Sequence, residues 1–154
     1  MDKRYDELFD MLEKKTLRKR YKGTNRKDFP EYRGALFGFV RPRFHYKGYL
    51  ELSLDSKTFP EIYKLLVDIG KDIVPFEFKT IQVNKNLICP PHKDNNNKGK
   101  SCLVSLGNYS GCNTIVGDTE YNTNRNPVVF AGSKILHYNT NDLRGTKYSV
   151  IYFQ

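Results

Sequence analysis

The first apolar pattern in the chain has the period of an amphipathic α-helix. An apolar residue recurs every three or four positions, at Tyr5, Leu8, Phe9 and Leu12. This spacing places the four side chains on one stripe of a helix. Lys and Arg crowd the residues that follow, where the dipole of a helix favours cations near its C-terminus. The pattern predicts one helix over residues 3–22.

A second helix is predicted to begin at Thr58-Phe59-Pro60-Glu61, which has the form of a capping box with proline in the first turn. The apolar positions that follow have helical spacing: Ile62, Leu65, Leu66, Ile69 and Ile73. Pro75 lies just past the expected end of this helix. Between the two helices, residues 34–40 and 46–54 have the composition and alternation of β-strands.

Beyond Pro75 the apolar segments are short and alternate as β-strands do. The candidates are residues 78–87, 89–94, 101–107, 112–116, 119–122, 127–131, 135–140 and 147–153. Gly, Asn, Asp and Pro separate nearly all of them. This number of short strands is typical of a jelly roll, or double-stranded β-helix. We therefore expect a mainly β fold with flanking α-helices, in one domain over 1–154, where residues 1–75 support a β core over 76–154.

The composition supports a packed domain outside the membrane. Hydrophobic residues make up 38% of the chain and charged residues 28%, a balance typical of globular proteins. No apolar run approaches the roughly 20 residues that span a bilayer. Cys89, Cys102 and Cys112 form neither a CxxC pair nor an even disulfide set. We expect reduced cysteines and an intracellular protein, either cytoplasmic or nuclear.

The net charge of +9 is unevenly distributed along the chain. Residues 1–50 contain 14 Lys or Arg and 7 Asp or Glu, a balance of +7, whereas residues 51–154 contain 12 and 10, a balance of +2. A basic first third favours a polyanionic partner such as nucleic acid. A well-solvated surface has the same composition, so charge alone leaves both interpretations open.

Three residues in the β region have the types and positions of metal ligands. In Pro90-Pro91-His92-Lys93-Asp94, residues i and i+2 of a strand point to the same side, so His92 and Asp94 can face one ion. The third ligand is expected from His137, in the penultimate strand candidate. Two histidines and one carboxylate occupy one face of an octahedron and leave three positions open. An iron(II) oxygenase needs those three positions, two for the oxo acid of 2-oxoglutarate and one for dioxygen.

A cation and several polar residues accompany this pattern. Lys147 follows His137 by ten residues, which is enough for a strand, a turn and a returning strand. It shares a strand face with Ser149, and the distal carboxylate of 2-oxoglutarate would pair with a lysine buried there. Arg144 is the competing cation, but it falls in an expected turn. Asn84 and Asn86, upstream of the ligand pair, are interpreted as cofactor-binding amides or as solvated residues of an edge strand.

These residues resemble the 2-oxoglutarate/iron(II) dioxygenases, and in particular the branch of the ten-eleven-translocation methylcytosine dioxygenases and the base-J thymidine hydroxylases. The similar segments are Asn84-Lys85-Asn86, His92 to Ser101, Leu106 to Gly111, Val129-Phe130-Ala131-Gly132, and His137 with Gly145-Thr146-Lys147-Tyr148-Ser149. They cover a little under half of the chain. Lys147 stands where this branch usually has arginine.

The resemblance implies a double-stranded β-helix and an oxidative reaction. Iron activates dioxygen, 2-oxoglutarate is decarboxylated to succinate, and a C–H bond of the substrate is oxidised. His92, Asp94 and His137 correspond to the iron ligands, and Lys147 with Ser149 to the residues that bind 2-oxoglutarate. Asn97 stands where the methylcytosine enzymes have an asparagine that touches the base.

The leading hypothesis is an enzyme that oxidises a methyl group of a DNA base, either 5-methylcytosine or thymine. Arg41 and Arg43, in a segment that mixes cations with aromatic residues, would contact the substrate strand. The base would have to leave the duplex to reach buried iron. The alternatives are an alkylated-base demethylase, a protein or small-molecule hydroxylase, and a binding module without catalysis. We expect a monomer.

Overall fold

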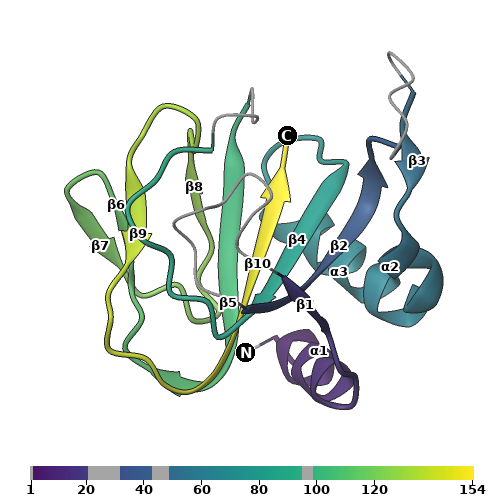
Figure 1. The fold of residues 1–154 in the computed structure, drawn as a ribbon, viewed down its shortest axis with the longest axis horizontal. Helices are drawn as coiled ribbons and strands as arrows, with labels where there is room; N and C mark the ends of the chain where they lie inside the picture. Colours follow the sequence, from purple (N-terminus) through teal and green to yellow (C-terminus); the bar gives the residue numbers. More distant parts are fainter. Residues whose placement is uncertain (1, 21–31, 43–48, 95–98) are drawn as a thin grey trace.

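Two antiparallel β-sheets of unequal size face each other in the protein, for which we use a computed structural model (Figure 1). The structure describes residues 2–20, 32–42, 49–94 and 99–154. The larger sheet has seven strands: β1 (Arg18–Arg20), β2 (Tyr32–Val40), β3 (Glu51–Leu52), β4 (Thr80–Lys85), β5 (Ser101–Ser110), β8 (Val128–Phe130) and β10 (Arg144–Phe153). Its order is β1-β2-β4-β10-β5-β8, with β3 beside β2. The smaller sheet has the order β7-β6-β9, from β6 (Thr114–Val116), β7 (Thr119–Tyr121) and β9 (His137–Asn139).

The two faces of β10 show how the larger sheet is used. Tyr148, Val150 and Tyr152 are buried in the apolar core between the sheet and the helices. Their alternate neighbours Ser149, Ile151 and Phe153 point the other way and line a cavity. The apolar residues of the outer face therefore pack against the helices, and the residues of the inner face point toward the cavity.

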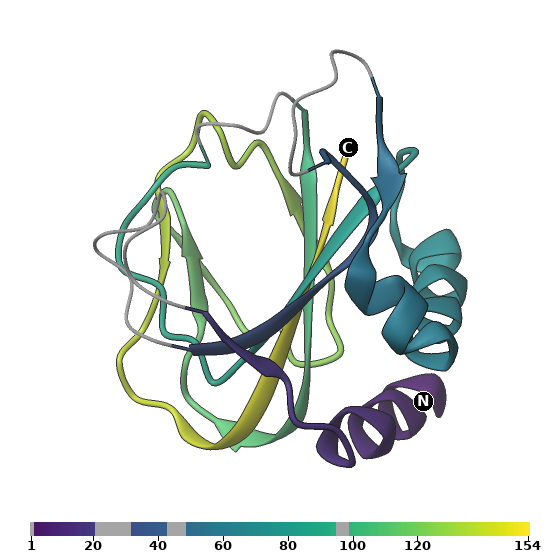
Figure 2. The ribbon, with the colours of Figure 1, turned by 45° about the vertical axis from the view of Figure 1, so that its right-hand side comes forward.

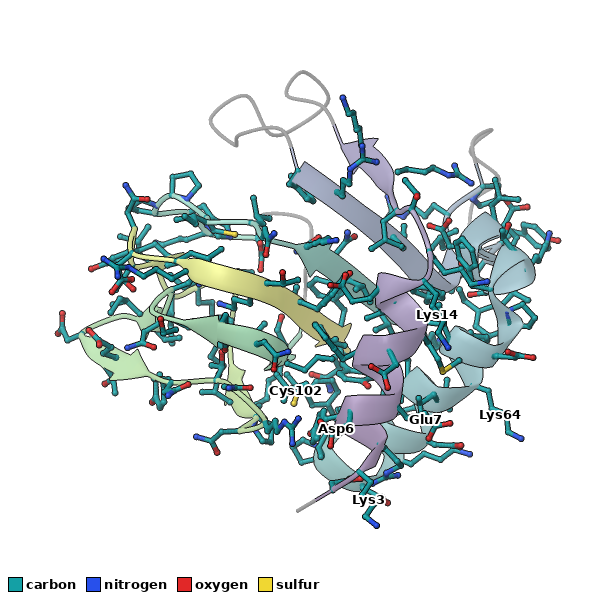
Figure 3. The ribbon with its side chains drawn as sticks, turned by 90° about the horizontal axis from the view of Figure 1, so that it is seen from below. Lys3, Asp6, Glu7, Lys14, Lys64 and Cys102 are labelled. Carbon is teal, nitrogen blue, oxygen red and sulfur yellow. The ribbon has the colours of Figure 1, made fainter. Side chains whose placement is uncertain are left out.

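Helices α1 (Arg4–Glu13) and α3 (Pro60–Ile73) cover the outer face of the larger sheet, opposite the smaller sheet (Figure 2). Tyr5, Leu8 and Leu12 of α1 belong to the core, and each buried side chain of this size contributes about 1.5–3 kcal/mol. Figure 3 shows the helices from the side that does not face the core, where Asp6, Glu7, Lys14 and Lys64 are exposed. None of the described helices is both long enough and apolar enough to cross a bilayer.

The prediction of one helix over 3–22 is wrong in its second half. The helix ends at Glu13, and Arg18–Arg20 form β1, which pairs with residues 32–34 of β2. The apolar stripe of the helix stops at Leu12, and the next core residue, Leu17, comes too late for that stripe. Without apolar contacts to hold it, the basic segment gains more from the hydrogen bonds of a sheet edge.

The start of the second helix also differs from the predicted capping box. Thr58 ends a separate short helix, α2 (Leu54–Thr58), and its hydroxyl donates to the carbonyl of Leu54 at 2.9 Å. The cap of α2 is Ser53, whose hydroxyl accepts a hydrogen bond from Ser56 N at 3.2 Å. Pro60 begins α3 as predicted, and Ile62, Leu65, Leu66 and Ile69 are buried.

The predicted fold class is confirmed: the structure is mainly antiparallel β with flanking helices. Strands occur in seven of the eight segments predicted beyond Pro75. Residues 89–94 are the exception, because they form a single bridge at His92 and no strand. Of the predicted strand 46–54, the structure describes residues 49–54, which contain the two residues of β3 and the start of α2. The single-domain organisation stays a prediction.

Two rows of paired residues mark the opposite ends of the larger sheet. We call one the Ser101 row, after its member on β5, and it consists of Gly38, Thr80, Phe153, Ser101 and Phe130. The other is the Tyr148 row, consisting of Lys19, Arg33, Lys85, Tyr148 and Leu106. On β10, Phe153 follows Tyr148 by five positions, which sets the rows about 17 Å apart at 3.3 Å per residue. In Figure 1 the C-terminus marks the upper end of the sheet, where the Ser101 row lies, and β1 crosses near the lower end.

Candidate metal centre

His92 and His137 are brought together by their own backbones. The amide of each donates to the carbonyl of the other, both at 3.0 Å, which forms an isolated antiparallel bridge between β9 and the segment 89–94. The amide of Asp94 donates to the carbonyl of Gly132 at 2.9 Å. One ligand atom from each of His92, Asp94 and His137 then lies within 4.8 Å of the others. The three residues predicted to bind metal therefore lie together.

The orientation of both imidazoles is set by main-chain carbonyls. Nδ1 of His92 lies 2.7 Å from the carbonyl of Pro90, and Nδ1 of His137 lies 2.8 Å from that of Ile135. A carbonyl only accepts, so Nδ1 carries a proton in both rings, and Nε2, which faces Asp94 as a hydrogen-bond donor, is the nitrogen that would lose its proton to bind a metal. Both Nε2 atoms face Asp94, at 3.5 Å from Oδ1 for His92 and 3.3 Å from Oδ2 for His137.

The electrostatics of the cluster keep Asp94 ionised. Burial opposes the charged form, but the hydrogen bonds with His137 and His92 outweigh it and hold the pKa of Asp94 well below its usual value. Burial lowers the pKa of His137, but the contact with Asp94 outweighs this effect, so the pKa of His137 lies above its usual value. A carboxylate that stays charged in a half-buried cluster is suited to binding a cation.

Gly132 sets the position of the Asp94 carboxylate, and it was not among the predicted site residues. A Cβ on Gly132 would lie 2.7 Å from Oδ2 of Asp94 and 3.3 Å from the hydroxyl of Ser101. Any side chain there would displace the ligand, whose amide is also held by the Gly132 carbonyl. The contact with Ser101 places the metal centre at the Ser101 row. The signal in the sequence was the quoted Val129-Phe130-Ala131-Gly132 segment, which gave no reason for a glycine.

The metal cluster opens into a cavity between the two sheets. This cavity contains about 620 Å³ of empty space, its open mouth included. Apolar side chains form much of the wall, among them Leu87, Leu103, Phe130, Ile151 and Phe153. Asn84 and Ser149 also line it, which places these two predicted cofactor residues in the same space as the metal ligands.

A row of small polar residues crosses the inner face of the larger sheet. Asn84 pairs with Ser149, and Ser149 pairs with Ser105. Asn84 accepts a hydrogen bond from Gln82 Nε2 at 2.9 Å, and the buried hydroxyls of Ser105 and Thr123 are 2.8 Å apart. Ser105 was not among the predicted site residues, although its alternation with the cavity residue Leu103 was a usable signal in the sequence.

Lys147 is on the same face of β10 as Ser149 but lies deeper. Only 1% of it is exposed, and its Nζ donates to the carbonyl of Cys112 at 2.7 Å and lies 3.3 Å from the Cys112 thiol. The ammonium also lies 5.4 Å from the centre of the Tyr109 ring. Among the described residues no carboxylate comes within 4.0 Å of Nζ. Arg144, the competing cation, is exposed at the start of β10.

The turn after β5 holds the carbonyl to which Lys147 donates. Gly111 and Cys112 both have left-handed backbones, with φ of 71° and 52°. The amide of Cys112 donates to Oδ1 of Asp142 at 2.8 Å. A Cβ on Gly111 would lie 2.1 Å from the Asp142 carbonyl, so only glycine fits. Asp142 thus fixes the turn that contacts the lysine.

The other residues predicted to belong to the site are placed differently. Asn86 does not share a face with Asn84, because β4 ends at Lys85 and Asn86 turns outward with φ of 54°. Its Oδ1 accepts from the backbone amide of Lys147 at 2.8 Å, so it ties β4 to β10. Arg41 is exposed just after β2 and outside the cavity wall. Asn97 and Arg43 lie outside the described residues.

The solved structures that share the fold of the chain include the following three. NgTET1 in complex with 5mC DNA is 15% identical with a TM-score of 0.63, over 99% of this chain and 68% of that one. An oxidoreductase of the 2OG-Fe(II) oxygenase family from Burkholderia pseudomallei is 15% identical with a TM-score of 0.57, over 97% and 76%. OsALKBH1 is 11% identical with a TM-score of 0.58, over 98% and 92%.

These likenesses establish that the chain shares its fold with these proteins, one of which is described as a 2OG-Fe(II) oxygenase, and the shared fold agrees with the one implied by the resemblance drawn from the sequence. No protein-family model matches the chain, and no curated protein matches it.

Proposed function

We propose that the chain is an iron(II)- and 2-oxoglutarate-dependent dioxygenase in which His92, Asp94 and His137 hold the iron. The observation that carries this proposal is the convergence of two Nε2 atoms and an ionised carboxylate at one end of a cavity. Two nitrogens and one oxygen on one side of an ion form the donor set of non-haem iron(II) oxygenases and leave the opposite side open. The residues present therefore fit iron.

Bound iron would supply activation of dioxygen, coupled to decarboxylation of 2-oxoglutarate to succinate and oxidation of a substrate C–H bond. The chain contributes the ligand orientation, because main-chain carbonyls fix both imidazoles before a metal arrives. It also contributes a cavity wall with many apolar side chains, which would lower the polarity around the reacting groups once a substrate fills the cavity.

We propose Lys147 as the residue that binds the distal carboxylate of 2-oxoglutarate. A buried cation is costly unless it is paired, and the contacts of Lys147 among the described residues are a carbonyl, a thiol and an aromatic ring. Ser149, two residues along the same face, lines the cavity and would donate a second hydrogen bond. Asn84 and Ser105 extend this polar surface across the sheet. Asn86 would act indirectly, by holding the backbone of Lys147.

The proposed substrate is a base in DNA whose methyl group is oxidised, either 5-methylcytosine or thymine. The net charge of +9 favours a polyanion, and the fold is shared with NgTET1 in complex with 5mC DNA. Arg41 and Arg43 would contact the strand, and Asn97 the base. An alkylated-base demethylase would use the same metal ligands and the same lysine, so it remains a second candidate, as does a protein or small-molecule hydroxylase.

The reaction and the substrate are tested by different measurements. Succinate formation from 2-oxoglutarate in the presence of iron(II) tests the reaction, with Asp94→Ala as the inactive control. Nucleoside mass spectrometry of DNA containing 5-methylcytosine, thymine or alkylated bases tests the substrate. Hydroxymethylated products support methyl oxidation, and loss of the alkyl group identifies a demethylase. Full succinate formation by Asp94→Ala would refute the metal assignment.

A further inference from the structure

Three segments meet at the metal centre: residues 91–94, 99–101 and 131–137. The amide of Asp94 donates to Gly132 at 2.9 Å, and His92 forms its bridge with His137. A Cβ on Gly132 would lie 3.3 Å from the Ser101 hydroxyl, so the start of β5 lies beside Gly132 as well. Residues next to these contacts therefore surround the metal ligands.

The exposed charges of these segments are all positive. Lys93, Lys100 and Lys134 are exposed, and we call them the lysine rim. Asp94 is the one acidic residue within the three segments, and it is the proposed iron ligand. Some of the described cations elsewhere have carboxylate partners, such as Arg4 with Asp2 and Lys85 with Glu13. Within the described part of the chain, no carboxylate lies within 4.0 Å of a rim lysine.

Apolar side chains lie beside the lysine rim. Ile135 is 38% exposed and Leu136 is 47% exposed, directly before the ligand His137. Cations next to exposed apolar groups suit a polymer that has both phosphates and apolar sugar or base faces. An inorganic anion would use the cations and leave the apolar surface uncovered.

The basic first third of the chain is placed differently. Lys19 is in the Tyr148 row, about 17 Å along the sheet from the Ser101 row and the metal. Its neighbour Arg18 lies 3.6 Å from the carboxylate of Asp55. Arg41 is the exception among the described cations of residues 1–50. It follows Gly38, a member of the Ser101 row, by three residues. Most of the described basic charge of the N-terminal third thus lies away from the metal centre.

We infer that the lysine rim binds the phosphates that flank the substrate base, an inference that rests on the proposed function. A base that enters the cavity leaves its own strand at the surface. The neighbouring phosphates then lie over residues that surround the metal, where Lys93, Lys100 and Lys134 neutralise them. The apolar surface of Ile135 and Leu136 packs against the adjacent sugar or base.

The experiment compares two triple variants that remove the same charge. Lys93→Gln, Lys100→Gln and Lys134→Gln form the rim variant. Lys3→Gln, Lys14→Gln and Lys64→Gln form the control, from exposed lysines that Figure 3 shows on the helical side. Fluorescence anisotropy measures the binding of the full chain to a labelled DNA oligonucleotide across a range of salt concentrations. Both variants are first checked for wild-type circular dichroism.

We expect the rim variant to bind DNA at least about tenfold more weakly at moderate salt. The slope of log affinity against log salt should fall by about two to three, because each phosphate contact contributes about 0.7–0.9. The control variant should keep the wild-type slope. Equal losses in the two variants would indicate net charge alone and overturn the rim, as would a rim variant that binds like the wild type. Polyglutamate bound as tightly as DNA, through the same lysines, would instead indicate an acidic protein partner.

Failure of this inference is distinguishable from failure of the proposed function. Iron(II) binding and succinate formation by the wild-type chain test the reaction without DNA. A chain that forms succinate while its rim variant binds DNA normally keeps the proposed reaction and loses the rim. A chain that binds DNA through the rim but binds no iron loses the proposed reaction and keeps the surface.

Discussion

The two faces of β10 serve opposite purposes although they are built from alternate residues of one strand. On the outer face, Tyr148, Val150 and Tyr152 are buried against the helices and contribute stability. On the inner face, Lys147 and Ser149 keep polar groups inside the protein, where they cost free energy unless a ligand pairs with them. Changes to the outer face should therefore alter folding, and changes to the inner face and the residues around its cavity should alter ligand binding.

Removal of a metal ligand is the largest expected change on the cavity side. Asp94→Ala, His92→Ala or His137→Ala should each abolish iron(II) binding and succinate formation, because two remaining donors are insufficient. The thermal unfolding temperature should change little, since none of the three is in the apolar core. Isothermal titration with iron(II) under nitrogen and a succinate assay measure the two effects. Iron binding at wild-type affinity in any of these variants contradicts the assignment.

On the outer face, Leu66→Ala should have the converse effect. Leu66 is fully buried between α3 and the sheet, so the cavity left by truncation should lower the free energy of unfolding by about 2–5 kcal/mol. The folded fraction should bind iron(II) as the wild type does. Urea denaturation measures the first quantity and titration below the unfolding transition measures the second. A selective loss of iron affinity would show that the two faces are coupled.

Lys147→Ala should raise the KM for 2-oxoglutarate by about 10- to 100-fold. This change corresponds to the loss of one charge-assisted hydrogen bond, which contributes about 1.5–3 kcal/mol. Iron affinity should be unchanged, because Lys147 contacts none of the metal ligands. Arg144→Ala is the matched control, since Arg144 is exposed three residues earlier on the same strand. A larger effect from Arg144→Ala would identify the arginine as the anchor.

Gly132→Ala tests the support of the metal centre without removing a ligand. The added methyl would lie 2.7 Å from Oδ2 of Asp94 and displace it. We expect iron(II) affinity to fall by about tenfold, as for other residues that orient metal ligands, with less effect on KM for 2-oxoglutarate. Gly117→Ala is the control. A methyl group at this turn would lie 3.6 Å from the side chain of Ile135, an ordinary van der Waals distance. Because Gly117 has a φ of 61°, this control should lose stability and keep its iron affinity.

The smallest expected effect concerns the turn that holds Lys147. Asp142→Ala removes the acceptor of the Cys112 amide, which should loosen the Cys112 carbonyl and raise the KM for 2-oxoglutarate a few-fold. Asp142→Asn retains an oxygen acceptor and should restore the wild-type KM. Steady-state kinetics at saturating iron separates this from a change in kcat. Equal KM values for Asp142→Ala and the wild type would show that the turn is held by other contacts.

The sequence by itself determined the fold class and the identity of the residues that meet at the metal centre. Strand alternation is local, so 147–153 could be assigned to a strand from its own residues. The predicted turn at Arg144 was wrong, because β10 begins there and Arg144 pairs with Ser110 of β5. The pairing of His92 with Asp94 across one intervening residue was likewise visible, and so was the rarity of histidine, with three in the chain. Lys147 stood out because a lysine in an apolar strand requires a partner.

Tertiary structure decided what local patterns do not contain. The segment 89–94 forms no strand, and His92 is positioned by a bridge with a residue 45 places later in the sequence. The helix predicted over 3–22 ended early because the edge of β2 offered hydrogen bonds to Arg18–Arg20. Gly132 and Asp142 act through contacts with residues far along the chain. The lysines that border the metal centre also depend on how distant segments meet. A count of charges along the sequence does not say which of them lie near the site until the strands are paired.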